Sequence, residues 1–389
     1  MLHDINEPQS SPAKFALFNL GFRPFFFAGG LFAIVSILLW GAILAGKLSI
    51  GAINPLWWHA HELIFGFSVA IIAGFLLTAV PNWTNSKGLN GWPLFILFSL
   101  WLAPRILLLI PQVPISLVAT IDILFYPYLI YVLAKPIIQT KLWRNIGLIF
   151  ILSLLASCNA ISYYSLLSDN LALFKTIHYA ATLCIIMVIN VVAGRVIPFF
   201  TSRATDWKKQ DTSTLIEMLT IITFCIFVFA VILNIPILTK VFSAITATVL
   251  FVRASRWGWQ HTAKNPLLWS LHLSYFCLPL GLILIASLNN FNVGFHIMTI
   301  GGIAGIILAM IARVSLGHTG RMLVISPLMK ISFIAIFGAA ICRALAPYFI
   351  EHYLLLILTS ASLWILAFAC FIYCYSHILW SPRPDGKQG

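Results

Sequence analysis

Charged residues are scarce in this sequence of 389 residues, and acidic residues are the scarcest. Lys, Arg, Asp and Glu make up 8% of the chain, whereas a soluble domain carries about 25%. A chain with so little charge cannot cover a water-facing surface, and 61% of its residues are hydrophobic. This composition excludes an ordinary soluble protein and indicates that lipid is the main solvent of the chain.

Several motifs of soluble enzymes and binding proteins are also missing. The seven cysteines all fall within apolar runs and form no Cys-x-x-Cys pair, which argues against disulfides and against a zinc site. The sequence contains no Cys-x-x-Cys-His motif for covalent haem attachment, no Walker motif and no nucleotide-binding glycine fingerprint. The net charge of +13 does not imply a nucleic-acid partner, because its distribution follows membrane topology instead.

Long apolar runs, by contrast, fill most of the chain. A transmembrane helix needs about 20 mainly apolar residues, and the connections between the runs are too short for a soluble domain. We therefore predict an all-α integral membrane protein of about twelve transmembrane helices, forming one polytopic domain over residues 1–389 with a polar N-terminal segment at 1–23. The predicted spans lie near 24–46, 56–80, 93–110, 115–134, 145–167, 176–199, 214–233, 236–252, 267–288, 294–312, 325–346 and 352–378.

The positive charges lie mainly on one side of these spans. Lys and Arg concentrate on the cytoplasmic side of membrane proteins, so the distribution predicts cytoplasmic N- and C-termini. The side of the termini holds 18 of these residues: Lys14, Arg23, Lys87, Lys135, Lys141, Arg144, Arg195, Arg203, Lys208, Lys209, Arg253, Arg256, Lys264, Arg313, Arg321, Lys330, Arg383 and Lys387. The other side holds 5: Lys47, Arg105, Lys175, Lys240 and Arg343.

The second span opens with a group of polar residues at its outer end. Asn54 is a suitable N-cap and Pro55 a suitable first helical residue, so the helix should begin there. His59 and Glu62 should share a face, whereas His61 lies about 200° around the helix from His59. The two histidines therefore suit two centres, or one ligand and a partner that orients it. The simpler interpretation is a pair of interfacial histidines beside an aromatic belt.

Two further spans repeat this placement. His178 and His296 stand near the outer ends of spans 6 and 10, which run in the same direction as span 2 and are separated from it by multiples of four helices. All three spans end inside in a polar motif, which suggests three four-helix arcs, although the motifs do not align convincingly as repeats. Glycine and alanine at four-residue spacing below the histidines favour close helix packing, or less probably contact with a flat cofactor.

Several long motifs, in one order along the chain, resemble those of the NnrS family. The resemblance rests on residues 21–26 (GFRPFF), 59–62 (HAHE), 74–84 (GFLLTAVPNWT), 194–201 (GRVIPFFT) and 309–321 (AMIARVSLGHTGR). It implies a protein of the bacterial cytoplasmic membrane that contains haem and copper and acts in denitrification or in defence against nitric oxide or a nitrosyl species. It does not imply a particular chemical step, so whether the protein is an enzyme stays open, and no electron donor is identified.

Imidazole is a ligand that suits both haem iron and copper. We therefore expect haem b, and less firmly copper, to be bound by His59 or His61 together with His178 and His296. A second possible cluster is formed by His272 and His318 near the inner side. Ionisable groups inside a membrane are functional candidates, and Glu62 and Asp122 would orient ligands or relay protons.

Arg105 and Arg343 break the charge distribution while lying within apolar sequence near the outer side. Three explanations are open: the side chains reach lipid headgroups, they pair with Glu62 or Asp122, or they bind the propionates of a haem held by the outer histidines.

Other functions remain compatible with the sequence. A secondary transporter of a small solute or metal complex also has twelve spans and intramembrane carboxylates. A haem-based sensor would need an output domain, for which the chain has no room. Haem–copper oxidases have twelve helices with metal-binding histidines on helices 2, 6, 7 and 10, but here span 7 contains none.

Overall fold

The computed structural model describes residues 15–51 and 53–386, and within these ranges the regular structure is entirely helical. Part of the polar segment predicted at 1–23, and the basic residues Lys14 and Lys387, lie outside the described residues. Eleven helical segments are long and apolar enough to cross a membrane, and the shorter apolar helix α4 makes the twelfth. The prediction of an all-α protein with about twelve spans is confirmed.

Ten of the twelve spans are built on one long α-helix each: α1 Phe22–Leu44, α4 Gly91–Leu107, α5 Ile115–Gln139, α6 Ile146–Leu167, α7 Leu171–Ala204, α8 Thr214–Ile232, α9 Pro236–Ser255, α10 Pro266–Ser287, α13 Pro327–Leu345 and α14 Tyr353–Trp380. Spans 2 and 10 each change to a π-helix for two turns. Span 2 consists of α2 Pro55–His61, η1 Glu62–Ser68 and α3 Val69–Thr84, and span 10 of α11 Phe291–His296, η4 Ile297–Ala304 and α12 Gly305–His318.

Residues recognisable in the sequence set where the spans begin. The side chain of Asn54 accepts hydrogen bonds from Leu56 and Trp57 at the start of α2, and Pro55 is the first helical residue, as predicted. Asn170 and Asn290 cap α7 and α11 in the same way. The three spans that carry the outer histidines thus all start from an asparagine cap.

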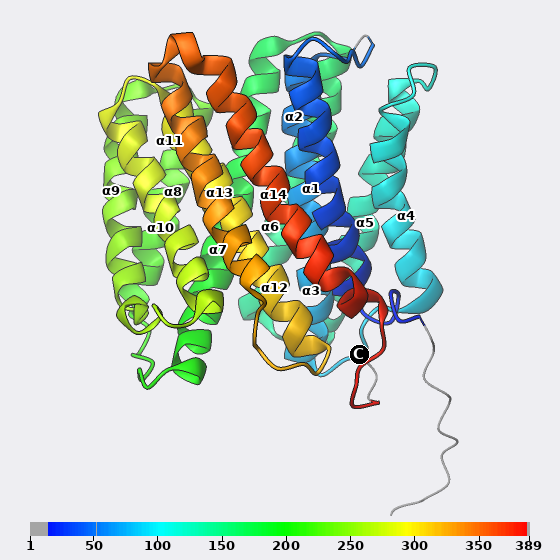
Figure 1. The fold of residues 1–389 in the computed structure, drawn as a ribbon, viewed down its shortest axis with the longest axis vertical. Helices are drawn as coiled ribbons and strands as arrows, with labels where there is room; N and C mark the ends of the chain where they lie inside the picture. Colours follow the sequence, from blue (N-terminus) through cyan, green and yellow to red (C-terminus); the bar gives the residue numbers. More distant parts are fainter. Residues whose placement is uncertain (1–14, 52, 387–389) are drawn as a thin grey trace, which may run out of the picture.

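The spans form one helix bundle in which α14 lies beside α1 (Figure 1). Most consecutive spans pack on one another, α5 on α6 and α9 on α10 among them, and α14 packs back on α1, which closes the ring. Spans 2, 6 and 10 lie toward the inside, where α7 contacts α2 and both π-helices. Spans 2 and 10 are the most buried, with 83% of their central residues inside the protein. This arrangement agrees with the predicted three arcs.

The three inner spans also share two residues at the same spacing. His61, His178 and His296 hold equivalent positions, and a threonine follows each histidine after 23 residues: Thr84, Thr201 and Thr319. All three threonines are buried, and each donates a hydrogen bond to the carbonyl four residues earlier. The π-helices η1 and η4 likewise begin directly after His61 and His296. The sequence therefore contains a threefold repeat in register, which the motif comparison missed because most of the side chains between these positions differ.

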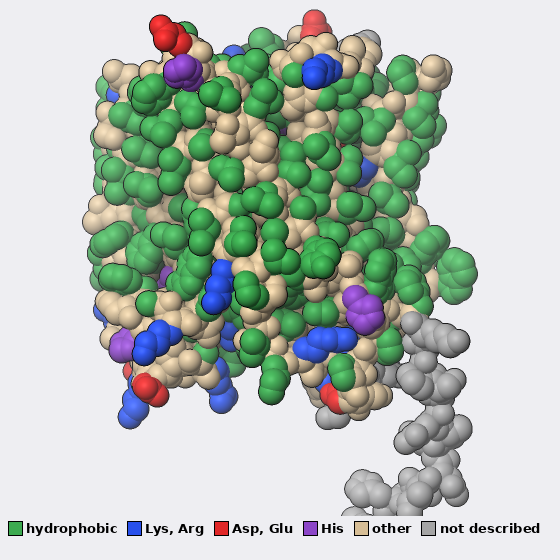
Figure 2. Space-filling model, in the orientation of Figure 1, with side chains coloured by type: hydrophobic (Ala, Val, Ile, Leu, Met, Phe, Trp, Pro, Cys, Tyr) green, Lys and Arg blue, Asp and Glu red, His purple; other side chains and the backbone are tan. Residues whose placement is uncertain are grey.

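The surface matches a membrane protein. Figure 2 shows hydrophobic side chains over the middle of this face and basic side chains mostly at the end where the described chain also terminates. The assignment of that end to the cytoplasm stays a prediction.

Reporter fusions test this assignment. A fusion after residue 389 and one within the loop that follows α7, at 205–213, should both report the cytoplasm, because positive charge is retained on that side during insertion. A fusion in the connection between α6 and α7, at 168–170, should report the opposite side and serves as the control. An external signal from either of the first two fusions would contradict the orientation.

Candidate functional site

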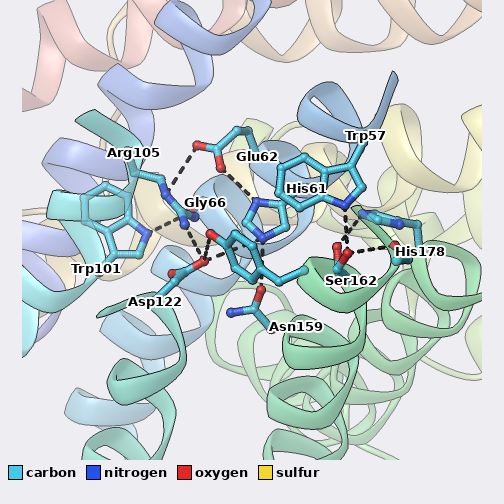
Figure 3. A network of polar contacts seen from close by, with 12 residues as sticks. Trp57, His61, Glu62, Gly66, Trp101, Arg105, Asp122, Asn159, Ser162 and His178 are labelled. Carbon is cyan, nitrogen blue, oxygen red and sulfur yellow. Dashed lines mark hydrogen bonds and ion pairs between the residues drawn. The ribbon is translucent and has the colours of Figure 1, made fainter. Parts of the chain in front are cut away.

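Two histidine-containing clusters occupy the outer half of the structure, and the first is a buried network of charged and polar side chains (Figure 3). Its ionisable members are His61, Glu62, Arg105 and Asp122, which come from spans 2, 3 and 4 and are at most 3% exposed. Burying charge in hydrocarbon costs several kcal/mol unless the groups are paired. The network must therefore be held together by its own contacts.

These contacts form a continuous chain. Arg105 donates from Nη2 to Oδ2 of Asp122 at 2.6 Å, and its Nε lies 3.3 Å from Oε2 of Glu62. The other oxygen of Glu62 lies 2.9 Å from Nδ1 of His61. On the opposite side of the ring, His61 Nε2 lies 2.9 Å from the side-chain oxygen of Asn159, and the Tyr163 hydroxyl donates to Asp122 at 2.9 Å.

Local backbone geometry aims these groups at one another. The change from α-helix to π-helix at Glu62 alters the angular spacing of side chains, a feature often found at functional sites. No hydrogen bond joins His59 to Glu62, and the expected pairing along one helix face is replaced by the contact of Glu62 with its neighbour His61. Trp57 stacks on the His61 ring at 4.4 Å, and the Trp101 indole donates to the carbonyl of Gly66, which fixes α4 against η1.

Of the three explanations for Arg105, pairing with carboxylates is the one seen in the structure. Its guanidinium pairs with both Asp122 and Glu62. A haem propionate would have to share or displace these two carboxylates. Arg105 is therefore a poor candidate for propionate binding, although the pairing explains why an arginine is tolerated at this depth.

His178 lies beside this network rather than within it. Its Nδ1 donates to the carbonyl of Phe174 at 2.8 Å, and its Nε2 lies 3.1 Å from the hydroxyl of Ser162. The carbonyl of Ser162 accepts a hydrogen bond from Trp57, whose ring also contacts both His61 and His178. Spans 2, 5 and 6 are thus joined at one level, and both ring nitrogens of His178 have partners.

The second cluster contains His59, His296 and Arg343 and is less buried. His59 stacks on Trp40 with ring centroids 4.2 Å apart, and neither of its nitrogens has a hydrogen-bond partner among the described residues. His296 donates from Nδ1 to the carbonyl of Asn292 at 2.7 Å, which leaves Nε2 without a partner there. His59 lies within electrostatic range of His296 and Arg343, and His296 within range of Arg343.

His59 and His61 thus lie in different clusters, whereas the prediction that they serve two centres, or act as a ligand and its orienting partner, stays a prediction. Arg343 has no ion pair with any carboxylate in the described part of the chain, unlike Arg105. The second cluster therefore combines two half-buried imidazoles with an arginine whose charge is not neutralised.

The other predicted cluster does not come together as one contact group. His272 donates from Nε2 to the Thr201 hydroxyl at 2.9 Å, because that hydroxyl donates its own hydrogen to the carbonyl of Ile197, whereas the His318 ring packs on Phe22. Across residues 15–51 and 53–386, no three His, Cys, Asp or Glu side chains gather closely enough to hold a metal ion by themselves. All seven cysteines are free, as expected.

The sequence analysis missed a further buried network near the inner side. Arg253 on α9 makes two hydrogen bonds to Glu217 of α8, at 2.8 and 2.6 Å, and also donates to the Tyr275 hydroxyl. Tyr275 in turn donates to Asn190 of α7. The sequence did contain a signal for this network, because its polar residues stand within apolar runs. The same signal was present for Asn159 and Tyr163, which lie one helical turn apart on span 5.

The fold and these clusters define a twelve-span helical membrane protein that keeps histidines and paired charges within its membrane-embedded part. The chain belongs to the NnrS family: the family description "NnrS protein" matches residues 16–383, nearly the whole chain. Family membership supports a membrane protein whose role is related to nitric oxide. A comparison with curated proteins found no match.

Proposed function

We propose that this protein binds haem b in its outer half and acts in the response to nitric oxide, with His59 and His296 as the iron ligands. The observation that carries the proposal is the second cluster, in which two histidines from neighbouring repeats each keep a ring nitrogen without a partner. Two histidines would be sufficient to hold a b-type haem, so the absence of a three-ligand group in the described residues does not count against the proposal.

The residues of the second cluster suit this cofactor. A metal-bound histidine usually donates its other ring nitrogen to a carbonyl or carboxylate, which fixes the ring and the tautomer. His296 has this arrangement through Asn292. Arg343 supplies an unneutralised guanidinium that suits a propionate, because a guanidinium binds carboxylates through paired hydrogen bonds. Haem held by both histidines would supply a redox-active iron, and nitric oxide would bind that iron only by replacing one of the two histidines.

His61 and His178 fit the role of ligand less well. Both nitrogens of each ring already have hydrogen-bond partners, and His61 is completely buried. We propose that His61, Glu62 and Asp122 instead hold span 2 in place against its neighbouring helices. Trp57 and η1 connect this network to the segment that carries His59. Copper binding is proposed only from family membership, with the same histidines as the available ligands.

The transporter alternative receives less support from the repeat structure. Secondary transporters are commonly built from two repeated halves with the substrate site between them. Here the correspondence is threefold, and the equivalent spans 2, 6 and 10 run in the same direction.

An absorption spectrum of the detergent-purified protein tests the proposal. We expect a Soret band, a reducible b-type haem and iron in stoichiometric amount. His59→Ala and His296→Ala should each abolish or shift the band, and Arg343→Gln should weaken haem retention, with Arg343→Lys restoring part of it. His352→Ala, at an exposed histidine near the outer end of α14, is the control and should leave the spectrum unchanged.

Two results would contradict the assignment. Unaltered spectra in both the His59 and the His296 variants would exclude the second cluster as the haem site. Loss of haem in a correctly inserted His178→Ala variant, with His59→Ala unaffected, would move the site to the first network.

A further inference from the structure

An apolar cavity of about 70 Å³ lies among the three inner spans. Its walls come from α1, α3, α7, α10 and α12, and every described residue that lines it is hydrophobic. Spans 2 and 10, which supply much of the wall, are also the most buried helices of the protein. The cavity is therefore formed by buried helices but is partly open rather than enclosed, and Phe75, Val192 and Met310 in its wall are only partly buried.

Equivalent positions of the three inner spans line the cavity. The residues ten and eleven positions after the equivalent histidines all face the cavity: Ile71, Ile72, Val188, Ile189, Ile306 and Ile307. Because a helix rises 1.5 Å per residue, the cavity lies about 15 Å inward from those histidines, near the middle of each span. It thus sits where the three repeats meet, at the mid-depth of the membrane-embedded part.

The chemistry of the walls restricts what can bind. A buried water needs two to four polar partners, so a cavity without them stays dry and accepts apolar molecules. An engineered apolar cavity of about 150 Å³ takes benzene or xenon, and a space of about half that volume suits a smaller molecule. The Met310 thioether is the only atom among the lining side chains that could ligate a metal; the wall offers no donor for a polar solute and too little room for a macrocycle.

We propose that this cavity is a binding chamber for a small uncharged apolar molecule, namely a diatomic gas. Such molecules dissolve in the hydrocarbon of the bilayer, and the cavity lies at the same depth. The chamber is separate from the histidine clusters and needs no cofactor to form. The identification of nitric oxide as the natural occupant rests on the proposed function, whereas the capacity of the chamber for an apolar gas does not.

Xenon binding tests the chamber directly. Purified protein in lipid nanodiscs, titrated with xenon and followed by ¹²⁹Xe nuclear magnetic resonance, should show one saturable site. Ala193→Leu adds three carbon atoms to the wall and should reduce xenon affinity at least tenfold. Ala244→Leu, the same change at an exposed position on α9, should have no effect. Nitric oxide should displace xenon from the unaltered protein.

The unfolding temperature shows whether the Ala193→Leu variant is folded, and it should not fall because the substitution fills a void. Equal xenon binding in Ala193→Leu and the unaltered protein, no saturable site, or a lipid chain found in the cavity would each overturn the proposal. A protein that takes up xenon but shows no Soret band would refute the haem proposal and leave the chamber intact. A haem-loaded protein without a xenon site would refute the chamber and leave the haem proposal intact.

Discussion

Arg105→Gln should lower the free energy of unfolding by about 3–5 kcal/mol, the cost of removing one partner from a buried ion pair. The substitution would leave Asp122 and Glu62 with only His61 and Tyr163 as partners in a site that water does not reach. Unfolding followed by tryptophan fluorescence in detergent measures the loss. Restoring the charge balance in the double variant Arg105→Gln, Asp122→Asn should recover part of it.

A second arginine–aspartate pair provides the matched control. Arg383 and Asp385 also lie 2.6 Å apart, but this pair is near the surface. Exposed ion pairs contribute about 0–1 kcal/mol because water screens them and the side chains lose freedom. Arg383→Gln should therefore have a small effect. If Arg105→Gln and Arg383→Gln lower the free energy of unfolding by the same amount, burial is not the reason that the Arg105 network stabilises the protein.

Gly194→Ala should destabilise the inner half of the bundle by about 3 kcal/mol or more, because overpacking and the loss of charged hydrogen bonds add together. A Cβ atom at position 194 would collide with the guanidinium of Arg253, whose Cζ would be 2.8 Å away. Arg253 would have to leave its contacts with Glu217 and Tyr275. The unfolding temperature and the yield of inserted protein are the measurements.

Gly317→Ala is the control for this prediction. Gly317 also lies in a helix near the inner side, but a Cβ atom there meets nothing. Replacing glycine by alanine at a compatible helical position stabilises by about 0.4–1 kcal/mol, mainly through the unfolded chain. A loss in Gly317→Ala similar to that in Gly194→Ala would show that helix geometry, rather than the Arg253 contacts, explains both.

The two buried networks hold different parts of the helix bundle together. The outer one joins spans 2 to 5 around His61, and the inner one joins spans 6 to 9 around Arg253. Between them lie the hydrophobic contacts of the inner spans and the apolar cavity. The second histidine cluster, near the outer surface, belongs to neither network; its contacts include the stacking of His59 on Trp40 and the hydrogen bond from His296 to the carbonyl of Asn292.

The sequence by itself determined the features that depend on neighbours along the chain. Hydropathy gave the twelve spans, because each helix must be apolar over the thickness of the bilayer. Asn54 and Pro55 gave the start of span 2, because a cap acts on the next turn of its own helix. The angular separation of His59 and His61 predicted that the two rings point in different directions, and in the structure they have different neighbours. The threefold repeat was also present in the sequence, in the threonines at 84, 201 and 319.

Only the tertiary structure decided which helices meet, and this determined the state of every candidate side chain. His61 and His296 hold equivalent positions in the repeat, yet both nitrogens of His61 have partners from its own residue neighbour and from span 5, whereas Nε2 of His296 has none among the described residues. Arg105 and Arg343 looked alike in the sequence, but only Arg105 faces the carboxylates of Asp122 and Glu62. Hydropathy reports how well a segment dissolves in lipid, whereas pairing and cavities depend on the packing of distant segments against one another.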